Sequence, residues 1–256
     1  MRTCIYTALV TGAICLATAG TAGATFWSSP LAGYWPLNEG SGQVARDWSG
    51  QGNHGTLGST AGVDVNDPTW IRGIFGLGHA LNFGGDDFVA IPDSRDLEPS
   101  RITVETWFRG GESPGQYKYL VAKGGSGCEE AGSYGLYTSK NRGLAFYVYD
   151  GSEWTRSPEA DPAQVWDGRW HHAAGTFDGT TVRMFVDGRQ IGTGSPAGSA
   201  IAYDLPEGGA ALGNYAEPCD LMFAGDLDEV RVWSRALPVS DIWDRVRLLL
   251  ALFRNH

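Results

Sequence analysis

The chain has 256 residues and a formal net charge of −10 at pH 7, with 19 basic against 29 acidic side chains. This acidic balance argues against nucleic acid and anionic membranes as partners, because both require a basic surface. The composition includes 37 glycines and ten residues each of Trp, Tyr and Phe. Many short strands joined by tight turns are typical of such a composition.

The N-terminus has the pattern of a secretory signal peptide. Arg2 precedes an apolar run over residues 5–19, which is too short to span a bilayer. The small residues at 22–24 form an A-x-A site, so we expect cleavage after Ala24. The sequence therefore predicts a signal peptide over 1–24 and a secreted protein, exported from a bacterium, that is not an integral membrane protein.

Two of the four cysteines, Cys4 and Cys15, fall within the predicted leader, which leaves Cys128 and Cys219. A remaining pair in an oxidising compartment indicates one disulfide. Two free buried thiols are the alternative.

Short apolar or alternating segments bounded by turn residues predict the strands. They cover residues 33–37, 88–91, 102–108, 119–122, 134–138, 144–149, 172–177, 182–186 and 227–233. Many short strands at this spacing indicate an all-β fold, a two-sheet antiparallel sandwich or jelly roll. We expect it to form one domain over residues 25–236.

Only the end of the chain has helical periodicity. After Pro238, apolar residues recur at helical spacing from Ile242 to Phe253. We expect a short helix within residues 237–256 that packs on the sandwich. A tail that binds a partner or lies on a membrane is the alternative.

The glycines Gly50, Gly52 and Gly55 have the spacing of a dinucleotide-binding loop. That loop needs a preceding strand and a following helix whose N-terminus meets the phosphates. The residues that follow Gly55 start no helix, so we expect no nucleotide here. The alternative is that these glycines supply positive φ angles in a turn.

The acidic segment near the C-terminus is a candidate catalytic site. Laminarinase-type glucanases carry E-x-D-x-x-E on a strand, and the two outer acids perform the hydrolysis. In this chain Asp226 and Asp228 fit the first part, but Arg231 occupies the position of the last acid. We therefore predict no catalytic residues. An enzyme that uses Glu105 with Asp226 or Asp228 is the alternative.

Several motifs together resemble a known family. They are "GYWPLNEGSGQVARDWSGQGNHGTL", "GHALNFGGDDFVAIPDSRDLEPSRITVETWFR", "LVAKGG", "WHHAAGTFDGTTVRMFVDGR" and "GDLDEVRVWSRALPVSDI". Their order is similar to that of laminin-G-like domains of the concanavalin A-like lectin/glucanase superfamily, over about residues 31–242. The resemblance implies a two-sheet jelly roll whose first and last strands are adjacent, and which serves binding more often than catalysis.

The resemblance also implies a structural calcium ion. Calcium takes six to eight oxygen ligands. The oxygen-bearing positions that match are Asp47, Ser49 and Asn53 in the opening turn and Asp228 in the last strand. The alternative is that Asp47 and Asn53 form Asx turns without a metal.

Carbohydrate sites combine a flat aromatic face with a few polar groups. Alternation places Tyr147 and Tyr149 on one face of a strand. A disulfide between Cys128 and Cys219 would bring two aromatic and acidic loops together. The candidate ligand-binding residues are Tyr134, Tyr147, Tyr149, Trp154, Tyr215 and Glu217. Packing in the core is the alternative for any one of these aromatic residues.

The sequence therefore predicts a secreted, non-catalytic module that binds carbohydrate or an extracellular protein, with calcium as its only expected ion. Two alternatives stay open: a polysaccharide-cleaving enzyme, either a glycoside hydrolase or a lyase, and a structural or adhesion protein.

Overall fold

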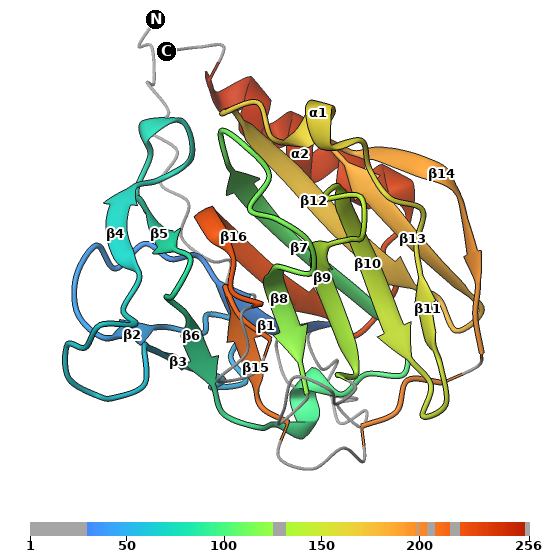
Figure 1. Cartoon of the computed structure of the whole chain (residues 1–256), viewed down its shortest axis with the longest axis horizontal. Helices are drawn as coiled ribbons and strands as arrows, with labels where there is room; N and C mark the ends of the chain where they lie inside the picture. Colours follow the sequence, from blue (N-terminus) through green and yellow to red (C-terminus); the bar gives the residue numbers. More distant parts are fainter. Residues whose placement is uncertain (1–29, 125–131, 199, 204–207, 216–220, 254–256) are drawn as a thin grey trace, which may run out of the picture.

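A computed structural model describes residues 30–124, 132–198, 200–203, 208–215 and 221–253. Two antiparallel sheets of eight strands each lie face to face (Figure 1). Sheet A has the order β14-β13-β12-β7-β16-β5-β4, with β1 also paired to β16, and sheet B has the order β11-β10-β9-β8-β15-β6-β3-β2. The predicted all-β jelly-roll sandwich is confirmed.

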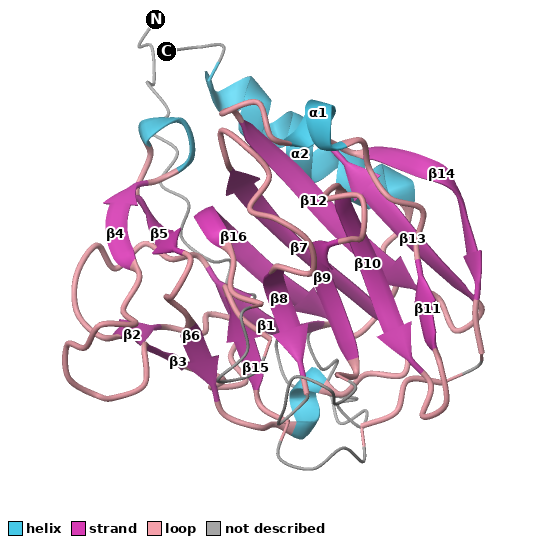
Figure 2. Ribbon diagram, viewed as in Figure 1, coloured by secondary structure: helices cyan, strands magenta, loops and turns pink. Residues whose placement is uncertain are grey.

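The strands of sheet A are β1 (Leu31–Trp35), β4 (Thr69–Arg72), β5 (His79–Gly84), β7 (Ile102–Arg109), β12 (Trp170–Phe177), β13 (Thr181–Val186), β14 (Arg189–Pro196) and β16 (Ala224–Trp233). Those of sheet B are β2 (Val44–Ala45), β3 (Gly55–Leu57), β6 (Val89–Ile91), β8 (Tyr119–Lys123), β9 (Tyr134–Thr138), β10 (Leu144–Tyr149), β11 (Trp154–Arg156) and β15 (Ala210–Leu212). The helices are α1 (Pro162–Val165) and α2 (Val239–Phe253), with 3₁₀ turns η1 (Ile74–Gly76) and η2 (Arg95–Leu97) (Figure 2).

The hydrophobic core fills the space between the sheets. Alternate residues of each strand point inward, as the period of two requires. On β7 these include Val104 and Phe108, and on β10 they include Leu144, Phe146 and Val148, all buried in one cluster. The remaining residues of each strand face outward, and we call the two outward surfaces the outer face of sheet A and the outer face of sheet B.

The first and last strands pair, as the resemblance implies. Tyr34 of β1 lies opposite Arg231 of β16, and Trp35 lies opposite Val230. A bulge interrupts β16 between Asp228 and Arg231. Bulges re-aim neighbouring side chains, so Asp228 and Arg231 both end on the outer face of sheet A.

The opening turn uses its glycines in two ways. Gly50 and Gly52 have φ angles of +91° and +82°, which favour glycine. Gly55 has no positive φ; a Cβ there would lie 2.5 Å from Cγ1 of Val89. The turn interpretation therefore holds for two of the glycines, whereas close strand packing explains the third.

Helix α2 lies along the outer face of sheet A, away from sheet B (Figures 1 and 2). Ile242 is fully buried and packs with Phe185, Trp233 and Leu237. Val246 packs with Trp107 in a second small cluster. The helix is thus a cover for one sheet.

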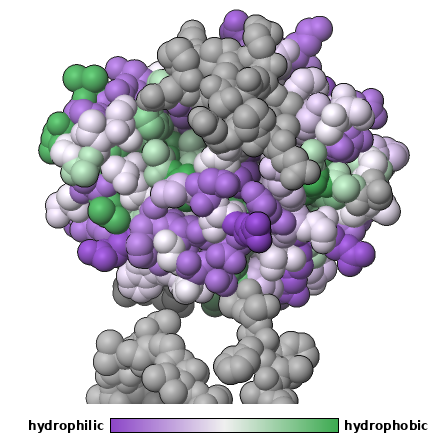
Figure 3. Space-filling model, turned by 90° about the horizontal axis from the view of Figure 1, so that it is seen from below, coloured by the Kyte–Doolittle hydropathy of each residue, from purple (hydrophilic) through white to green (hydrophobic). Residues whose placement is uncertain are grey.

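One face of the molecule is mainly hydrophilic. Seen from below, hydrophilic side chains dominate and the hydrophobic patches are separate (Figure 3). Among the described residues, no helix combines the length and apolar character needed to cross a bilayer.

Candidate functional site

Four tyrosines gather on the outer face of sheet B, and we call them the tyrosine cluster: Tyr119, Tyr137, Tyr147 and Tyr215. Tyr119 stacks on Tyr137 with ring centroids 5.3 Å apart and contacts Tyr215 at 4.6 Å. Tyr147 meets Tyr137 edge to face at 5.3 Å. None of the four is more than 9% exposed, so the cluster supports the surface from beneath.

Local sequence explains this packing. Gly135 lies between Ala122 and Tyr147 on neighbouring strands, and a Cβ there would approach Tyr147 to 2.6 Å. Burial raises the pKa of the Tyr147 phenol well above its usual value, with further contributions from Tyr119 and Tyr215. Tyr147 therefore stays protonated even at pH values where an exposed tyrosine would ionise.

An exposed aromatic group lies beside the cluster. We call it the aromatic platform: Tyr149, Trp154 and Arg156. Tyr149 of β10 pairs with Trp154 of β11, and their ring centroids are 5.0 Å apart at an angle of 40°. Trp154 is 40% exposed, and the Arg156 guanidinium lies 5.7 Å from its ring. The platform offers the face of the exposed Trp154 ring with a hydrogen-bond donor next to it, which suits a sugar ring.

The structure separates the predicted ligand-binding residues into three groups. Tyr149 and Trp154 belong to the platform, and Tyr147 and Tyr215 belong to the buried cluster. Tyr134 lies in the core with no exposed surface, and its hydroxyl donates to the Leu97 carbonyl at 3.1 Å, so it does not face the site. Glu217 lies outside the described residues, as do both cysteines of the predicted disulfide, Cys128 and Cys219.

Arg156 was not predicted. It follows Trp154 by two residues and so shares its face of β11. This alternation was the signal in the sequence that could have identified it.

The predicted calcium ligands of the opening turn are engaged with one another. Asp47 Oδ1 accepts the backbone N–H groups of Tyr34 and Ser49, at 2.9 and 2.8 Å. Asp47 Oδ2 accepts the Ser49 hydroxyl and the Asn53 N–H, both at 2.8 Å. Both carboxylate oxygens are thus surrounded by donors, and Asn53 donates its amide to the Ala32 carbonyl at 3.0 Å. This geometry is that of an Asx turn.

The fourth predicted ligand, Asp228, contacts a different segment. Its Oδ2 accepts the N–H of Ile74 at 2.8 Å, and Oδ1 has no hydrogen-bond partner among the described residues. Within the described ranges, no group of three or more His, Cys, Asp or Glu side chains could hold a metal. The four positions do not form a ligand set as they stand, and calcium stays a prediction of the resemblance.

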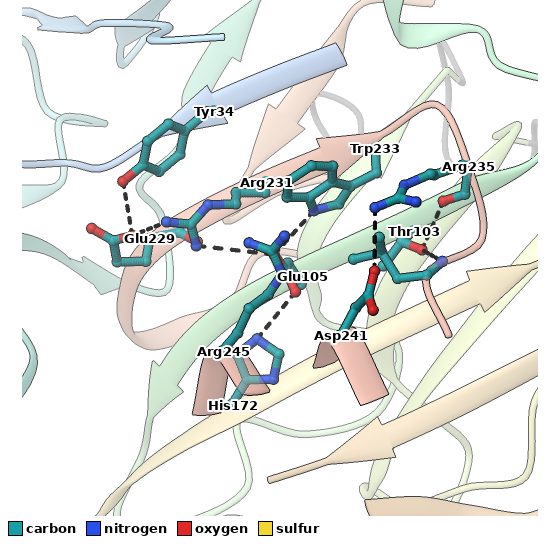
Figure 4. A network of polar contacts seen from close by, with 11 residues as sticks. Tyr34, Thr103, Glu105, His172, Glu229, Arg231, Trp233, Arg235, Asp241 and Arg245 are labelled. Atoms are coloured by element: carbon teal, nitrogen blue, oxygen red, sulfur yellow. Dashed lines mark hydrogen bonds and ion pairs between the residues drawn. The ribbon is translucent and has the colours of Figure 1, made fainter. Parts of the chain in front are cut away.

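The acids weighed for catalysis do not form an accessible pair. Glu105 has no exposed surface and lies in a polar network between sheet A and α2 (Figure 4). The Trp233 indole donates to its Oε1 at 3.0 Å, and His172 Nε2 lies 3.4 Å from its Oε2. Arg245 of α2 lies 3.7 Å from Oε1 and stacks on Trp233, with 4.2 Å between the guanidinium and the ring centroid.

The same network sets the charge of Glu105. Burial alone would raise its pKa, but the hydrogen bond and charge of His172 and the charges of Arg231 and Arg245 outweigh it and hold the pKa at about 2. Glu105 is therefore an ionised structural group that joins α2 to the sheet. It cannot reach a substrate.

Comparisons with known proteins agree with this architecture. The family described as Concanavalin A-like lectin/glucanases superfamily (Laminin_G_3) matches residues 83–243, more than half of the chain. A search of the curated proteins found no match.

Several solved structures are similar. One is domain 4 of AbnA, a GH43 extracellular arabinanase from Geobacillus stearothermophilus, in complex with arabinotriose, with 18% identity and a TM-score of 0.62 over 84% of this chain and 97% of that chain. Another is the binding domain of Paraclostridial Mosquitocidal Protein 1, with 12% identity and a TM-score of 0.62 over 84% of this chain and 51% of that one.

A third is a sialidase of Trypanosoma rangeli in complex with the inhibitor DANA, with 17% identity and a TM-score of 0.58 over 84% of this chain and 32% of that chain. The chain thus spans only about half of the toxin domain and a third of the sialidase. At these identities the likeness shows the fold alone.

Proposed function

Because the chain belongs to the concanavalin A-like lectin/glucanase superfamily, we propose that it is a secreted, non-catalytic module that binds carbohydrate through the aromatic platform. The platform is the observation that carries the proposal. Trp154 is exposed and Tyr149 is partly exposed. Strand pairing holds both rings in place, and a guanidinium lies beside Trp154. A carbohydrate ligand is also present in one similar solved structure, the arabinanase domain, whose complex contains arabinotriose.

The proposal that the chain is not a catalyst rests on the positions of Glu105, Asp226 and Asp228. A glycosidase needs two accessible carboxyl groups flanking one bond. Glu105 is fully buried beneath α2, and Asp228 is 2% exposed. Asp226 is held by Arg109 and Asn82, at 2.6 and 2.7 Å. The alternative of polysaccharide cleavage through these residues is therefore not favoured.

The test is a glycan array followed by titration calorimetry on the mature chain. We expect binding to one class of glycan and a loss of roughly tenfold in affinity for Trp154→Ala, because removing a stacked aromatic costs about 1 kcal/mol or more. Trp48→Ala is the matched control, since Trp48 is 66% exposed and lies in the opening turn, away from the platform. An equal loss in both variants, or no glycan bound at all, would overturn the proposal.

A further inference from the structure

A cavity lies on the outer face of sheet A, outside the proposed carbohydrate platform, and we call it the Arg109 cavity. Its volume is about 430 Å³, within the range of small-molecule sites. It is formed where β4, η1, β5, β7, β12 and β16 meet. The side chains that matter here are Arg72, Phe75, Asn82, Arg109, Trp170 and Asp226.

Arg109 is fixed on two sides. Its Nε donates to Asp226 Oδ2 at 2.6 Å, and the guanidinium lies 4.9 Å from the centroid of the Trp170 ring. Asp226 is fixed in turn, because its Oδ1 accepts the Asn82 amide at 2.7 Å. The terminal amino groups of Arg109 make no hydrogen bond to another described residue, and the side chain is 38% exposed. A guanidinium held in this way presents a preorganised donor pair to a carboxylate.

The charge of the cavity favours an anion. Arg72 is a second guanidinium in the lining, and the only side-chain hydrogen bond that it makes to a described residue is a long one, 3.4 Å, to the Gly76 carbonyl. Two arginines face one carboxylate, Asp226, so the cavity is positive on a chain whose formal net charge is −10. The next outward acid on β16, Asp228, is 2% exposed and does not line the cavity.

The lining also offers an aromatic surface. Phe75 is 37% exposed and meets Trp107 edge to face at 5.8 Å. Its φ of +54° is unusual for a bulky residue, and strained residues of this kind gather at ligand sites. Pyranose rings pack their C–H faces on such rings, which a simple carboxylate cannot do.

A neighbouring cavity extends the same chemistry. It has a volume of about 440 Å³, shares Trp170 with the first, and carries Arg169, Arg189 and Trp243. Its acid Asp187 is already paired with His171, at 2.8 Å. The basic and aromatic lining thus continues past Trp170 into the neighbouring cavity.

We propose that the Arg109 cavity binds the carboxylate of a uronic acid unit in an acidic oligosaccharide. Arg109 forms the bidentate contact, Arg72 supplies the second positive charge, and Phe75 packs against the sugar ring. Further acidic units occupy the cavity beyond Trp170. This site is separate from the aromatic platform, so either can exist without the other.

The experiment is titration calorimetry of the mature chain with a trimer of galacturonate, the neutral galactose trimer and sodium acetate. We expect the acidic trimer to bind at least tenfold more tightly than either of the others. Arg109→Gln should weaken the acidic trimer at least tenfold. Arg183→Gln is the matched control, since Arg183 also pairs with an aspartate, Asp178 at 2.5 Å, on the same sheet outside the cavity.

A second variant guards against loss of folding, because Arg109→Gln leaves Asp226 without its partner. Arg72→Gln removes a side chain at the edge of the cavity, and it should weaken the acidic trimer several-fold with an unchanged melting temperature. Equal affinity for the neutral trimer or acetate would overturn the proposal, as would full binding by both arginine variants. Loss of acidic-trimer binding in Trp154→Ala would also overturn the proposal, because it would show that the trimer binds at the aromatic platform on sheet B.

Discussion

Asp228 is a buried carboxyl group on β16, and among the described residues only one of its two oxygens accepts a hydrogen bond. Burial, together with the nearby charge of Glu229, raises its pKa to about 8, although the Ile74 N–H that it accepts acts in the opposite direction. The side chain is therefore uncharged at pH 7. An ordinary aspartate in the unfolded chain is ionised from about pH 4 upward, so folding takes up a proton at this residue between those two values.

Replacing Asp228 by asparagine is expected to stabilise the protein increasingly as the pH rises. Between about pH 4 and pH 8 the native protein loses up to roughly 1.4 kcal/mol per pH unit at this group, because the unfolded chain binds fewer protons. Asparagine has no such loss, and its amide oxygen can still accept the Ile74 N–H. Urea unfolding of Asp228→Asn and the unchanged protein at pH 5, 6.5 and 8 measures the difference. A difference that does not change with pH would contradict a buried, protonated acid.

The same variant bears on the predicted calcium ion. Calcium requires an ionised carboxylate, so an ion at Asp228 would stabilise the unchanged protein through mass action but would not stabilise Asp228→Asn. Melting temperatures with millimolar calcium and with a chelator distinguish the two cases. Equal melting temperatures with calcium and with a chelator would contradict a calcium site. Asp47, Ser49 and Asn53 would then serve only the Asx turn.

At the residue scale, the sequence predicts which aromatic and acidic side chains are candidates for a site, but not always which face of a strand each one occupies. Alternation correctly placed Tyr147 and Tyr149 on one face of β10. It could not tell that Tyr134, on the neighbouring strand, faces the core, because either face of a strand in a sandwich can hold a tyrosine. Asp226 is paired with Arg109 across two strands that lie 117 positions apart, which no local pattern reveals.

At the scale of elements, α2 is part of the folded domain. Ile242 is fully buried among Phe185, Trp233 and Leu237. The segment before the helix is also anchored, because Thr103 accepts the N–H of Leu237 at 2.8 Å. The helix therefore contributes to stability through its apolar face and through the Arg245 contacts with Glu105 and Trp233.

Truncating that face should destabilise the whole protein. We expect Ile242→Ala to lower the free energy of unfolding by about 2–4 kcal/mol, the usual effect of removing a buried isoleucine. Leu248→Ala is the control: Leu248 is 67% exposed on the same helix, so its loss should stay within about 0.5 kcal/mol. Both are measured by urea unfolding. If both variants change the stability equally little, the helix is a loosely attached tail, as the alternative interpretation holds.

The predicted strands are those whose residues alternate or form apolar runs, and all of them are present among the described residues. The strands that were missed have other compositions. β14 contains Gly192 and Gly194, β5 interrupts its apolar residues with Asn82, and β11 has three residues. Such segments become strands because neighbours supply the pairing, an effect of tertiary context that outweighs local propensity.

For the whole molecule, the sandwich is a scaffold with two outward surfaces. The aromatic platform lies on the outer face of sheet B, and the Arg109 cavity lies on the outer face of sheet A. Between them is a single packed core that includes Trp35, Phe83 and Phe108. The two proposed sites share no residue, and close-packed interiors of this kind deform little.

This arrangement predicts that the two sites bind independently. Coupling between ligands requires two global states that each ligand prefers differently, and a rigid core between the faces offers no such pair. Titration of a neutral glycan found for the platform should therefore give the same affinity, within about twofold, with and without saturating galacturonate trimer. Arg109→Gln should leave the affinity for the neutral glycan unchanged, and Trp154→Ala should leave that for the acidic trimer unchanged. Competition between the two ligands would show instead that both occupy one surface.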